Sequence, residues 1–360
     1  MTVNGVTATA LATATAPPPT FPLMVTSAPL IPATRVRVGI VLAIVLAGRV
    51  AAATADGAAE VTDRRELIVP TPGAELLRID NPLGRVSVRA WDRPGQIHII
   101  AEKRAASQEA IGRLRVHYTA WQSGEISIET RVELGGRERS LPLSGSRVDL
   151  VIEVPAELAI AAKTFGGDLT ASGLRGGARL ETTGGRIGVS DVRGGVVTRQ
   201  LMGGQTVKSV DGDVDLDGVE GDLDVHGVGG GRLDARMVDG SIRVEDIRSA
   251  LVRLTTTTGE ILFVGLLRPA AHYDLRSYTG DVRVVPAVDH GGFELHARSS
   301  LPIESSLPMR TIWRRGDRLH AEVLGRRRAG TAAQAGALVE LSSVFGRVII
   351  QPRSEGPSLR

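Results

Sequence analysis

The chain has 360 residues, with 43 Lys and Arg against 40 Asp and Glu and no Cys. The lack of Cys excludes disulfide scaffolds, Cys-ligated zinc, iron–sulfur clusters and thiol catalysis, and a net charge of +3 gives no reason to expect nucleic-acid binding. A content of 43 Gly with only 3% aromatic residues predicts a core of small aliphatic side chains and many tight turns.

The first part of the sequence reads as a targeting region. Residues 1–34 form a low-complexity segment rich in Ala, Thr and Pro, and its part before Met24 is not translated if Met24 is the start. Arg35 and Arg37 then precede an apolar run at 38–47, and A-x-A patterns end at Ala53 and Ala55. This order predicts a signal peptide over 35–55 and export to the periplasm, the cell surface or the medium. The run is shorter than the ~20 residues of a membrane span, so we expect no stable span after signal cleavage.

The next segments predict strands and one helix. We expect a linker at 56–75, followed by a single domain at 76–352 and a disordered tail at 353–360. Alternating apolar and polar residues predict strands at 77–80, 86–88, 97–99, 116–120, 125–130 and 148–154. A short helix is expected at 107–114, where Ser107 is a suitable N-cap and Ala110, Ile111 and Leu114 have helical spacing.

The middle of the chain is a repeat built on glycine. Gly recurs at 185, 194, 204, 212, 221, 230 and 240, each time followed by alternating residues. A half-period of about nine residues gives coils of about 18–19 residues with two short strands each. Such units bury a core only when they stack, so the pattern predicts an all-β fold, a single-chain parallel β-helix or solenoid. A sandwich also has strands at this spacing, but the nearly constant register favours the solenoid.

The order of these segments resembles the bacterial DUF4097 adhesin-like β-strand repeat family. The resemblance covers about 76–351 and rests on the segments 80–92, 148–155, 183–187, 258–261 and 341–348. It implies an exported single-chain β-helix and brings no catalytic motif. The irregular, Arg- and Gly-rich segment 313–336 is expected to be a loop over the last coil.

The acidic run at 211–224 is the most conspicuous cluster of charge. It contains Asp211, Asp213, Asp215, Asp217, Glu220, Asp222 and Asp224, with no cation among them. The first part matches the opening of an EF-hand loop, but no helix pattern flanks it. We interpret these residues as outward positions of two strands, with a weak calcium site as the alternative, because a divalent ion relieves repulsion between stacked carboxylates.

No catalytic, cofactor-binding or metal-binding residue is assigned, and no cofactor is expected. The seven His residues show no H-E-x-x-H motif, so a metal site of three His is left only as a spatial alternative. Trp91 is expected to plug the core, and 255–258 to form a Thr-rich corner. A basic cluster is expected to be a solvated face, or else to contact an acidic polymer, a lipid headgroup or another copy; it comprises Arg314, Arg315, Arg318, Arg326, Arg327 and Arg328.

The sequence therefore predicts an exported, non-catalytic interaction module of the cell envelope. Its partner is expected to be an envelope component, a polysaccharide or a protein, and not nucleic acid. Two alternatives remain: a structural scaffold that associates with itself through its ends or edges, and a carbohydrate-active enzyme on a β-helix.

Overall fold

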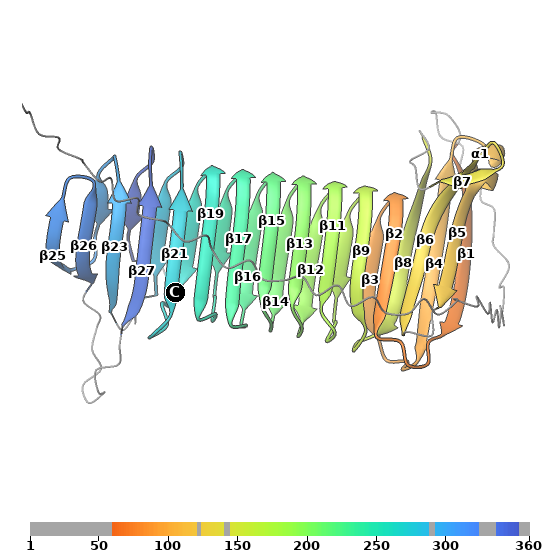
Figure 1. Ribbon diagram of the computed structural model, residues 1–360, viewed down its shortest axis with the longest axis horizontal. Helices are drawn as coiled ribbons and strands as arrows, with labels where there is room; N and C mark the ends of the chain where they lie inside the picture. Colours follow the sequence, from red (N-terminus) through yellow and green to blue (C-terminus); the bar gives the residue numbers. More distant parts are fainter. Residues whose placement is uncertain (1–59, 121–123, 140–144, 288–291, 324–335, 353–360) are drawn as a thin grey trace, which may run out of the picture. The chain divides into compact units, whose positions relative to one another are not determined.

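The computed structural model describes residues 60–120, 124–139, 145–287, 292–323 and 336–352. The predicted signal peptide, the low-complexity segment and the tail lie outside these residues. The described strands form two long sheets that enclose one continuous apolar core (Figure 1). No helix among the described residues is long and apolar enough to cross a membrane.

The first sheet has 13 strands. In spatial order they are β1 (Val61–Pro70), β4 (Gln96–Ala105), β8 (Arg147–Pro155), β3 (Val86–Trp91), β10 (Leu169–Ser172), β12 (Ile187–Val192), β14 (Gln205–Val210), β16 (Leu223–Val228), β18 (Ile242–Glu245), β20 (Ile261–Gly265), β22 (Val282–Pro286), β28 (Val348–Ile350) and β24 (Ile303–Ser305).

The second sheet has 15 strands. In spatial order they are β25 (Met309–Arg315), β26 (Arg318–Val323), β23 (Phe293–Ser299), β27 (Ala337–Ser343), β21 (His272–Ser277), β19 (Leu251–Thr258), β17 (Arg232–Asp239), β15 (Val214–Glu220), β13 (Val196–Met202), β11 (Ala178–Gly184), β9 (Ala159–Gly166), β2 (Leu76–Leu83), β6 (Glu125–Leu134) and β5 (Leu114–Ala120), with β7 (Arg137–Arg139) paired to β6.

The regular part of the solenoid runs from β9 to β22. Each coil contributes one strand to each sheet, and equivalent strands of successive coils pair in parallel. One row of partners contains Ile160, Ala178, Val196, Val214 and Leu233, spaced by 18 residues and finally by 19. The predicted all-β solenoid and its coil length are thus confirmed. Along each strand the inward residues are mostly Val, Leu, Ile and Ala, as the alternation predicts.

One bend of each coil is closed by a stack of glycines. Gly221 and Gly240 have φ of 129° and 146°, a region that other residues rarely adopt. A Cβ on Gly240 would lie 1.6 Å from the carbonyl oxygen of Gly221, one coil away. The chain can turn this tightly only because the stacked bend positions have no side chain.

A row of mostly polar buried residues lies three positions before most of the bend glycines and bonds to several of their carbonyl groups, although Gly218 and Met237 interrupt it. The Thr256 hydroxyl lies 3.0 Å from the Gly240 carbonyl oxygen, and that of Ser277 donates to the Gly259 carbonyl oxygen at 2.9 Å. Such bonds matter because a buried carbonyl without a partner costs about 1–3 kcal/mol. The members of the row are Asn81, Thr164, Thr182, Gln200, Thr256, Ser277, Ser343 and Ser299.

Both ends of the solenoid depart from the order of the sequence. The coil of β2 and β3 lies between β6 and β8 on one side and β9 and β10 on the other. Likewise the coil of β27 and β28 is inserted between β21 and β22 and the earlier pair β23 and β24. Antiparallel strands then close the ends, with β4 and β1 beyond β8, β5 beyond β6, and β26 and β25 beyond β23.

Three local predictions are settled by these elements. The helix is present as α1 (Gln108–Arg113), and the Ser107 side chain accepts a hydrogen bond from the Ala110 amide. The predicted linker 56–75 is wrong over 61–70, because β1 pairs with β4 along its whole length. The predicted loop 313–336 is wrong at its start, because β25 and β26 pair as antiparallel strands there; residues 324–335 are outside the described ranges.

Candidate functional site

A row of exposed side chains runs along the length of the solenoid, next to the glycine bend. These residues stand one position after the buried polar row, so the pleat turns them outward. Their register places Phe165, Thr183, Leu201, Val219 and Val238 on five consecutive coils. We call this set, with its extension, the bend row: Phe165, Thr183, Leu201, Val219, Val238, Thr257, Tyr278 and Val344.

Most of the bend row is apolar and open to solvent. Phe165, Leu201, Val219, Val238 and Tyr278 are between 41% and 58% exposed. Single exposed apolar residues are common on soluble proteins, whereas contiguous sets mark interaction surfaces. The bend row runs across eight coils of the 15-stranded sheet, so it is an extended ridge and not a local patch.

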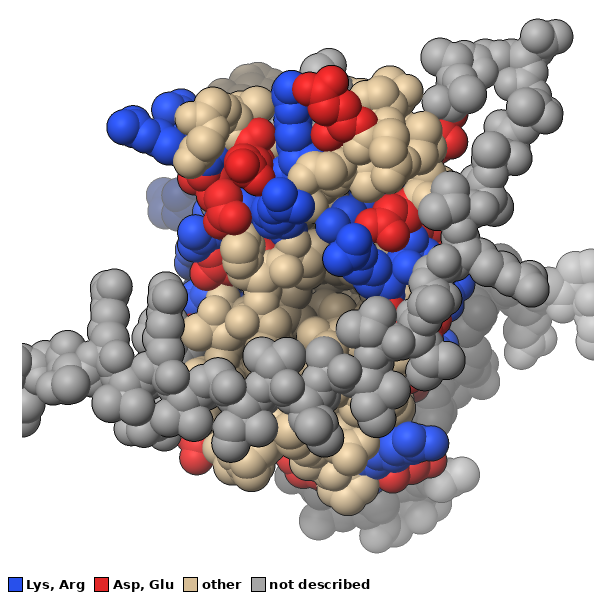
Figure 2. Space-filling model, turned by 90° about the vertical axis from the view of Figure 1, so that its right-hand side faces the viewer, with Lys and Arg blue, Asp and Glu red and all other residues tan. Residues whose placement is uncertain are grey.

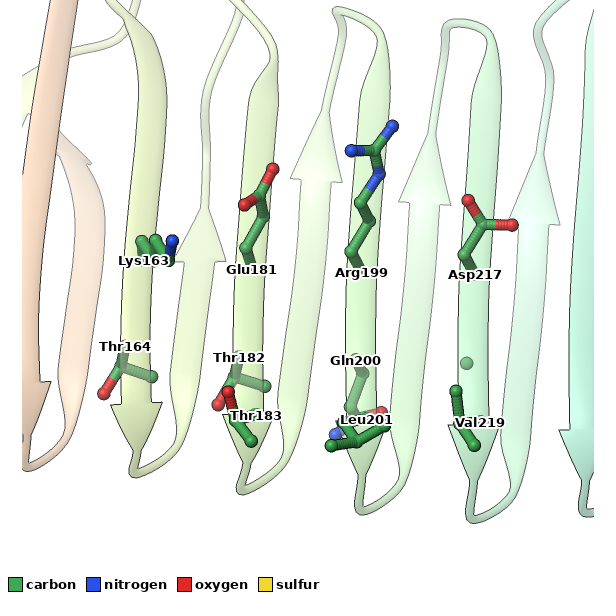
Figure 3. A pocket seen from close by; sticks show the side chains of 11 residues that line it. Lys163, Thr164, Glu181, Thr182, Thr183, Arg199, Gln200, Leu201, Asp217 and Val219 are labelled. Atoms are coloured by element: carbon green, nitrogen blue, oxygen red, sulfur yellow. The ribbon is translucent and has the colours of Figure 1, made fainter.

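A ladder of alternating charge runs beside the bend row. It comprises Lys163, Glu181, Arg199, Asp217 and Arg236, on β9, β11, β13, β15 and β17. Figure 3 shows the first four of these side chains. Arg236 Nη1 lies 3.0 Å from Asp217 Oδ1, and side chains in this position alternate in sign from strand to strand. Opposite charges on neighbouring strands stabilise the sheet modestly and leave the ladder with little net field.

A shallow depression lies between the charge ladder and the bend row. It has a volume of about 350 Å³ and is lined by side chains of β9, β11, β13 and β15, among them Thr182, Gln200 and Leu201 (Figure 3). The depression is open to solvent, unlike pockets that bury most of a small ligand. Its form therefore suits a ligand that lies along the surface.

The acidic run occupies outward positions, as predicted, but on two different sheets. Asp215 and Asp217 lie on β15, whereas Asp224 lies on β16 in the opposite sheet. Val214, Leu216, Leu223 and Val225 are buried between them. The run contains no EF-hand helix; it is a strand, a bend and a second strand.

Cations from the next coil compensate two carboxylates of the acidic run, Asp215 and Asp217. Arg236 contacts Asp217, and Arg232 lies 3.4 Å from Asp215. Both arginines also contact the carboxylate of Asp234, which is 2% exposed. Repulsion between the stacked carboxylates is thus reduced by Arg side chains that the sequence places 15 to 20 residues later, so the structure adds no support for calcium here.

The described histidines fall into two kinds of environment. His98, His117, His226 and His272 each lie 2.8–3.1 Å from an acidic side chain that no other histidine contacts, and His98 has Glu66 as a second neighbour at 3.8 Å. His296 and His320 instead share the same carboxylate, Glu294, on neighbouring strands. These three side chains are the one group of metal-ligating type found among the described residues, and the sequence did not identify it. His290 lies outside the described residues.

Hydrogen bonding lowers the pKa of two carboxylates that face these histidines. The bond from His296 lowers the pKa of Glu294, with a smaller contribution from His320. The bond from His98 lowers the pKa of Glu153, assisted by Arg89. In both sites the carboxylate is held in its ionised form, in which it accepts hydrogen bonds or binds a cation.

The remaining sequence expectations have mixed outcomes. Trp91 does not plug the core, because its side chain is only half-buried. Its ring stacks on that of His98, with the centroids 5.7 Å apart, and its Nε1 donates a hydrogen bond to the Gln96 carbonyl oxygen. Thr256 and Thr258 do form a hydrogen-bonded corner, as expected. Arg314, Arg315 and Arg318 are exposed on β25 and β26, while 326–328 lie outside the described residues.

Five chains of solved structures are similar to this one, including the following two. One is a proposed cell adhesion protein from Clostridium sporogenes, at 10% identity, with 81% of this chain and 100% of that chain covered and a TM-score of 0.27. The other is a proposed adhesin from Parabacteroides merdae, at 8% identity, with 80% and 95% covered and a TM-score of 0.28. Comparison with curated proteins found no match.

Comparison with family models agrees with the order of segments noted in the sequence. The model described as Toastrack DUF4097 matches residues 96–301, a range that includes the regular coils, the glycine bend and most of the bend row. Because this match spans more than half of the chain, the protein belongs to the Toastrack DUF4097 family.

Proposed function

We propose that this protein is an exported, non-catalytic interaction module of the cell envelope, and that the bend row with the charge ladder binds an extended segment of a partner protein. The observation that carries the proposal is the bend row, which keeps apolar side chains in water over many coils. Exposure of such a row stabilises nothing in the free protein, whereas covering it contributes about 25 cal/mol per Å² of buried apolar surface.

The chemistry of the surface favours a protein over a polysaccharide as the partner. The aromatic members of the bend row, Phe165 and Tyr278, stand far apart, and the positions between them carry only aliphatic and Thr side chains, so the row offers no continuous platform on which sugar rings stack. The neighbouring ladder carries both signs of charge. A protein segment with apolar and mixed charged residues complements both features, while a polyanion would meet Glu181 and Asp217.

The ends of the solenoid argue against a self-associating scaffold. The edge strand β1 carries Asp63, Arg64, Arg65 and Glu66, and the edge strand β25 carries three arginines. Charged side chains on an edge strand oppose pairing with another sheet. The end that carries β1, β5 and α1 shows acidic and basic side chains intermixed (Figure 2).

The shallow depression supports a binding function better than it supports the alternative of a carbohydrate-active enzyme. Its two carboxylates, Glu181 and Asp217, stand on β11 and β15, with Arg199 of β13 between them. Two strand spacings of about 4.8 Å separate their strands, which is at the upper limit for an inverting pair, but a cation stands between them and the lining contains no aromatic side chain. This arrangement resembles a charged binding surface more than a pair of catalytic carboxylates.

A binding screen tests the proposal. The chain from residue 56 onward, which contains the whole described core, is tested against envelope and matrix proteins, peptidoglycan, anionic polysaccharides and lipid vesicles, with every polymer checked for cleavage. We expect saturable binding to a protein. The double variant Leu201→Ser/Val219→Ser should weaken it at least about tenfold, since each side chain contributes about 1 kcal/mol or more on burial.

The control variant is Leu266→Ser, because Leu266 is 44% exposed but lies outside the bend row. It should bind as the unsubstituted protein does. Equal binding by the double variant would refute the bend row as the binding surface. Cleavage of a polymer would favour an enzyme, and concentration-dependent assembly without any binding would favour a scaffold.

A further inference from the structure

The C-terminal end of the 15-stranded sheet brings two histidines and a glutamate to one point. His296 on β23 and His320 on β26 are direct partners in the antiparallel register. Glu294 precedes His296 by two residues, so the pleat places both side chains on the same face of the strand. The three residues therefore meet because two strands pair, and not because they are close in the sequence.

The geometry of the three side chains is convergent. The Nε2 atoms of His296 and His320 each lie 2.9 Å from Oε1 of Glu294. Potential ligand atoms of all three lie within 4.8 Å of one another, and the centroids of the imidazole rings are 4.4 Å apart. The side chain of His320 is only 19% exposed. The ring of Trp313 packs against it in a T-shaped arrangement, with the ring centroids 5.8 Å apart. One wall of the cluster is thus apolar and the other open to water.

We propose that His296, His320 and Glu294 form a binding site for one divalent transition-metal ion, with Zn²⁺ as the best match. Two neutral imidazoles and one carboxylate are ligands that zinc accepts, in sites that leave a coordination position for water or another ligand. Imidazole ligands favour zinc, copper or nickel over calcium and magnesium, which prefer oxygen. In this structure the three side chains contact one another, and an ion would take the place of the protons they share.

Two of the arginines near the cluster are already paired with carboxylates. Arg298 contacts Asp317 at 2.9 Å, and Arg310 contacts Glu322 at 2.5 Å. Each of these positive charges already has a carboxylate partner. Glu294 is instead shared by two histidines, which give up their protons when a metal ion binds.

Metal binding would join two strands that only hydrogen bonds and packing now connect. The ion would link β23, which pairs with the inserted strand β27, to β26 of the closing hairpin. It would also present an open coordination position at the end of the sheet, away from the coils that carry the charge ladder. This site is independent of the proposed binding of a protein to the bend row.

The test is a titration of tag-free protein with Zn²⁺, since a His tag would itself bind the ion. Isothermal titration calorimetry should give one ion per chain, and Co²⁺ should give visible absorption bands characteristic of bound ligands. Loss of an outer-shell partner costs about 10- to 100-fold in metal affinity, so His296→Gln and His320→Gln should each weaken binding by about 100-fold or more.

The matched control is His272→Gln. His272 lies on the same sheet and contacts one carboxylate, Glu340, at 3.0 Å. This variant should bind Zn²⁺ as the unsubstituted protein does, and all variants should have the same melting temperature in EDTA. Absence of a stoichiometric site in the unsubstituted protein, or equal affinity in His296→Gln and His272→Gln, would overturn the proposal.

Discussion

Replacing Gly221 by Ala tests the stacked glycine bend. The new Cβ would lie 1.8 Å from the Gly203 carbonyl oxygen and 2.5 Å from its carbon, both backbone atoms of the previous coil. Cβ atoms essentially never approach other atoms closer than 3.0 Å, so the two coils must separate by more than an ångström at the bend. The backbone φ of 129° adds strain, because Ala rarely adopts it.

The expected loss of stability follows from these contacts. Strain at an unfavourable φ costs about 1–3 kcal/mol. Separation of the two coils weakens the hydrogen bond from Gly203 N to Glu220 O, and displacement of Gly221 weakens its own bond to Asp239 O of the following coil, at about 1 kcal/mol each. Gly221→Ala should therefore lower the free energy of unfolding by about 3–5 kcal/mol, and the melting temperature by about 6–15 °C.

The assay is thermal and urea unfolding followed by circular dichroism, with Gly188→Ala as the control. Gly188 lies in β12, and its Cβ would meet only the Thr170 methyl group at 3.4 Å, an ordinary contact. The control should unfold close to the unsubstituted protein. If Gly221→Ala is no less stable than Gly188→Ala, the argument that the bend requires residues without side chains is refuted.

Two further predictions concern polar groups. Thr256→Val should lower the free energy of unfolding by about 1–2 kcal/mol, because the Gly240 carbonyl loses its buried donor. The control is Thr257→Val, on the exposed neighbour, which should leave urea unfolding unchanged. The pKa of Glu153 lies below its ordinary 4.5, chiefly because of the hydrogen bond from His98. The ionised form of Glu153 therefore stabilises the fold above pH 4.5, and this stabilisation is lost as the pH falls through the lowered pKa. Glu153→Gln should therefore be less stable than the unsubstituted protein at pH 7 and equal to it in strong acid, as measured by calorimetry from pH 7 to pH 3; a difference that persists in acid would contradict the assignment.

The regular coils could be predicted because their information is local. Alternation over a few residues fixes which side chains face the core, and the spacing from Gly185 to Gly240 fixes the coil length. The polar row was not identified, although its members recur three residues before a bend glycine. Thr182, Thr256 and Ser277 look like ordinary strand residues until their carbonyl partners are known.

The features that were missed depend on pairing between distant segments. Nothing near β27 indicates that it inserts between β21 and β23, because parallel strands have no turn that fixes their neighbour. His296 and His320 become partners only through the register of β23 and β26. The cations of the acidic run were missed for the same reason: Arg232 and Arg236 belong to the next coil.

The acidic run also shows how adjacency in the sequence can mislead. Asp217 and Asp224 are close along the chain, yet the bend between them sends the two side chains to opposite sheets. Their nearest charged neighbours are therefore set by the coil period. In a solenoid, residues 18 or 19 positions apart are more informative about a local field than residues two or three apart.

The inserted coil of β27 and β28 sets the order in which the domain can be completed during synthesis. Most solenoids can add coils one after another as the chain emerges, because each coil packs on the one before it. Here β23 and β24 are made before β27 and β28 but pack outside them. The strands β23 and β24 can therefore take their final positions only after β27 and β28 have been synthesised, and any earlier pairing of β23 and β24 with β21 and β22 must first be broken. A chain that crosses a membrane while unfolded would thus have its closing step deferred until nearly all of the domain has been delivered.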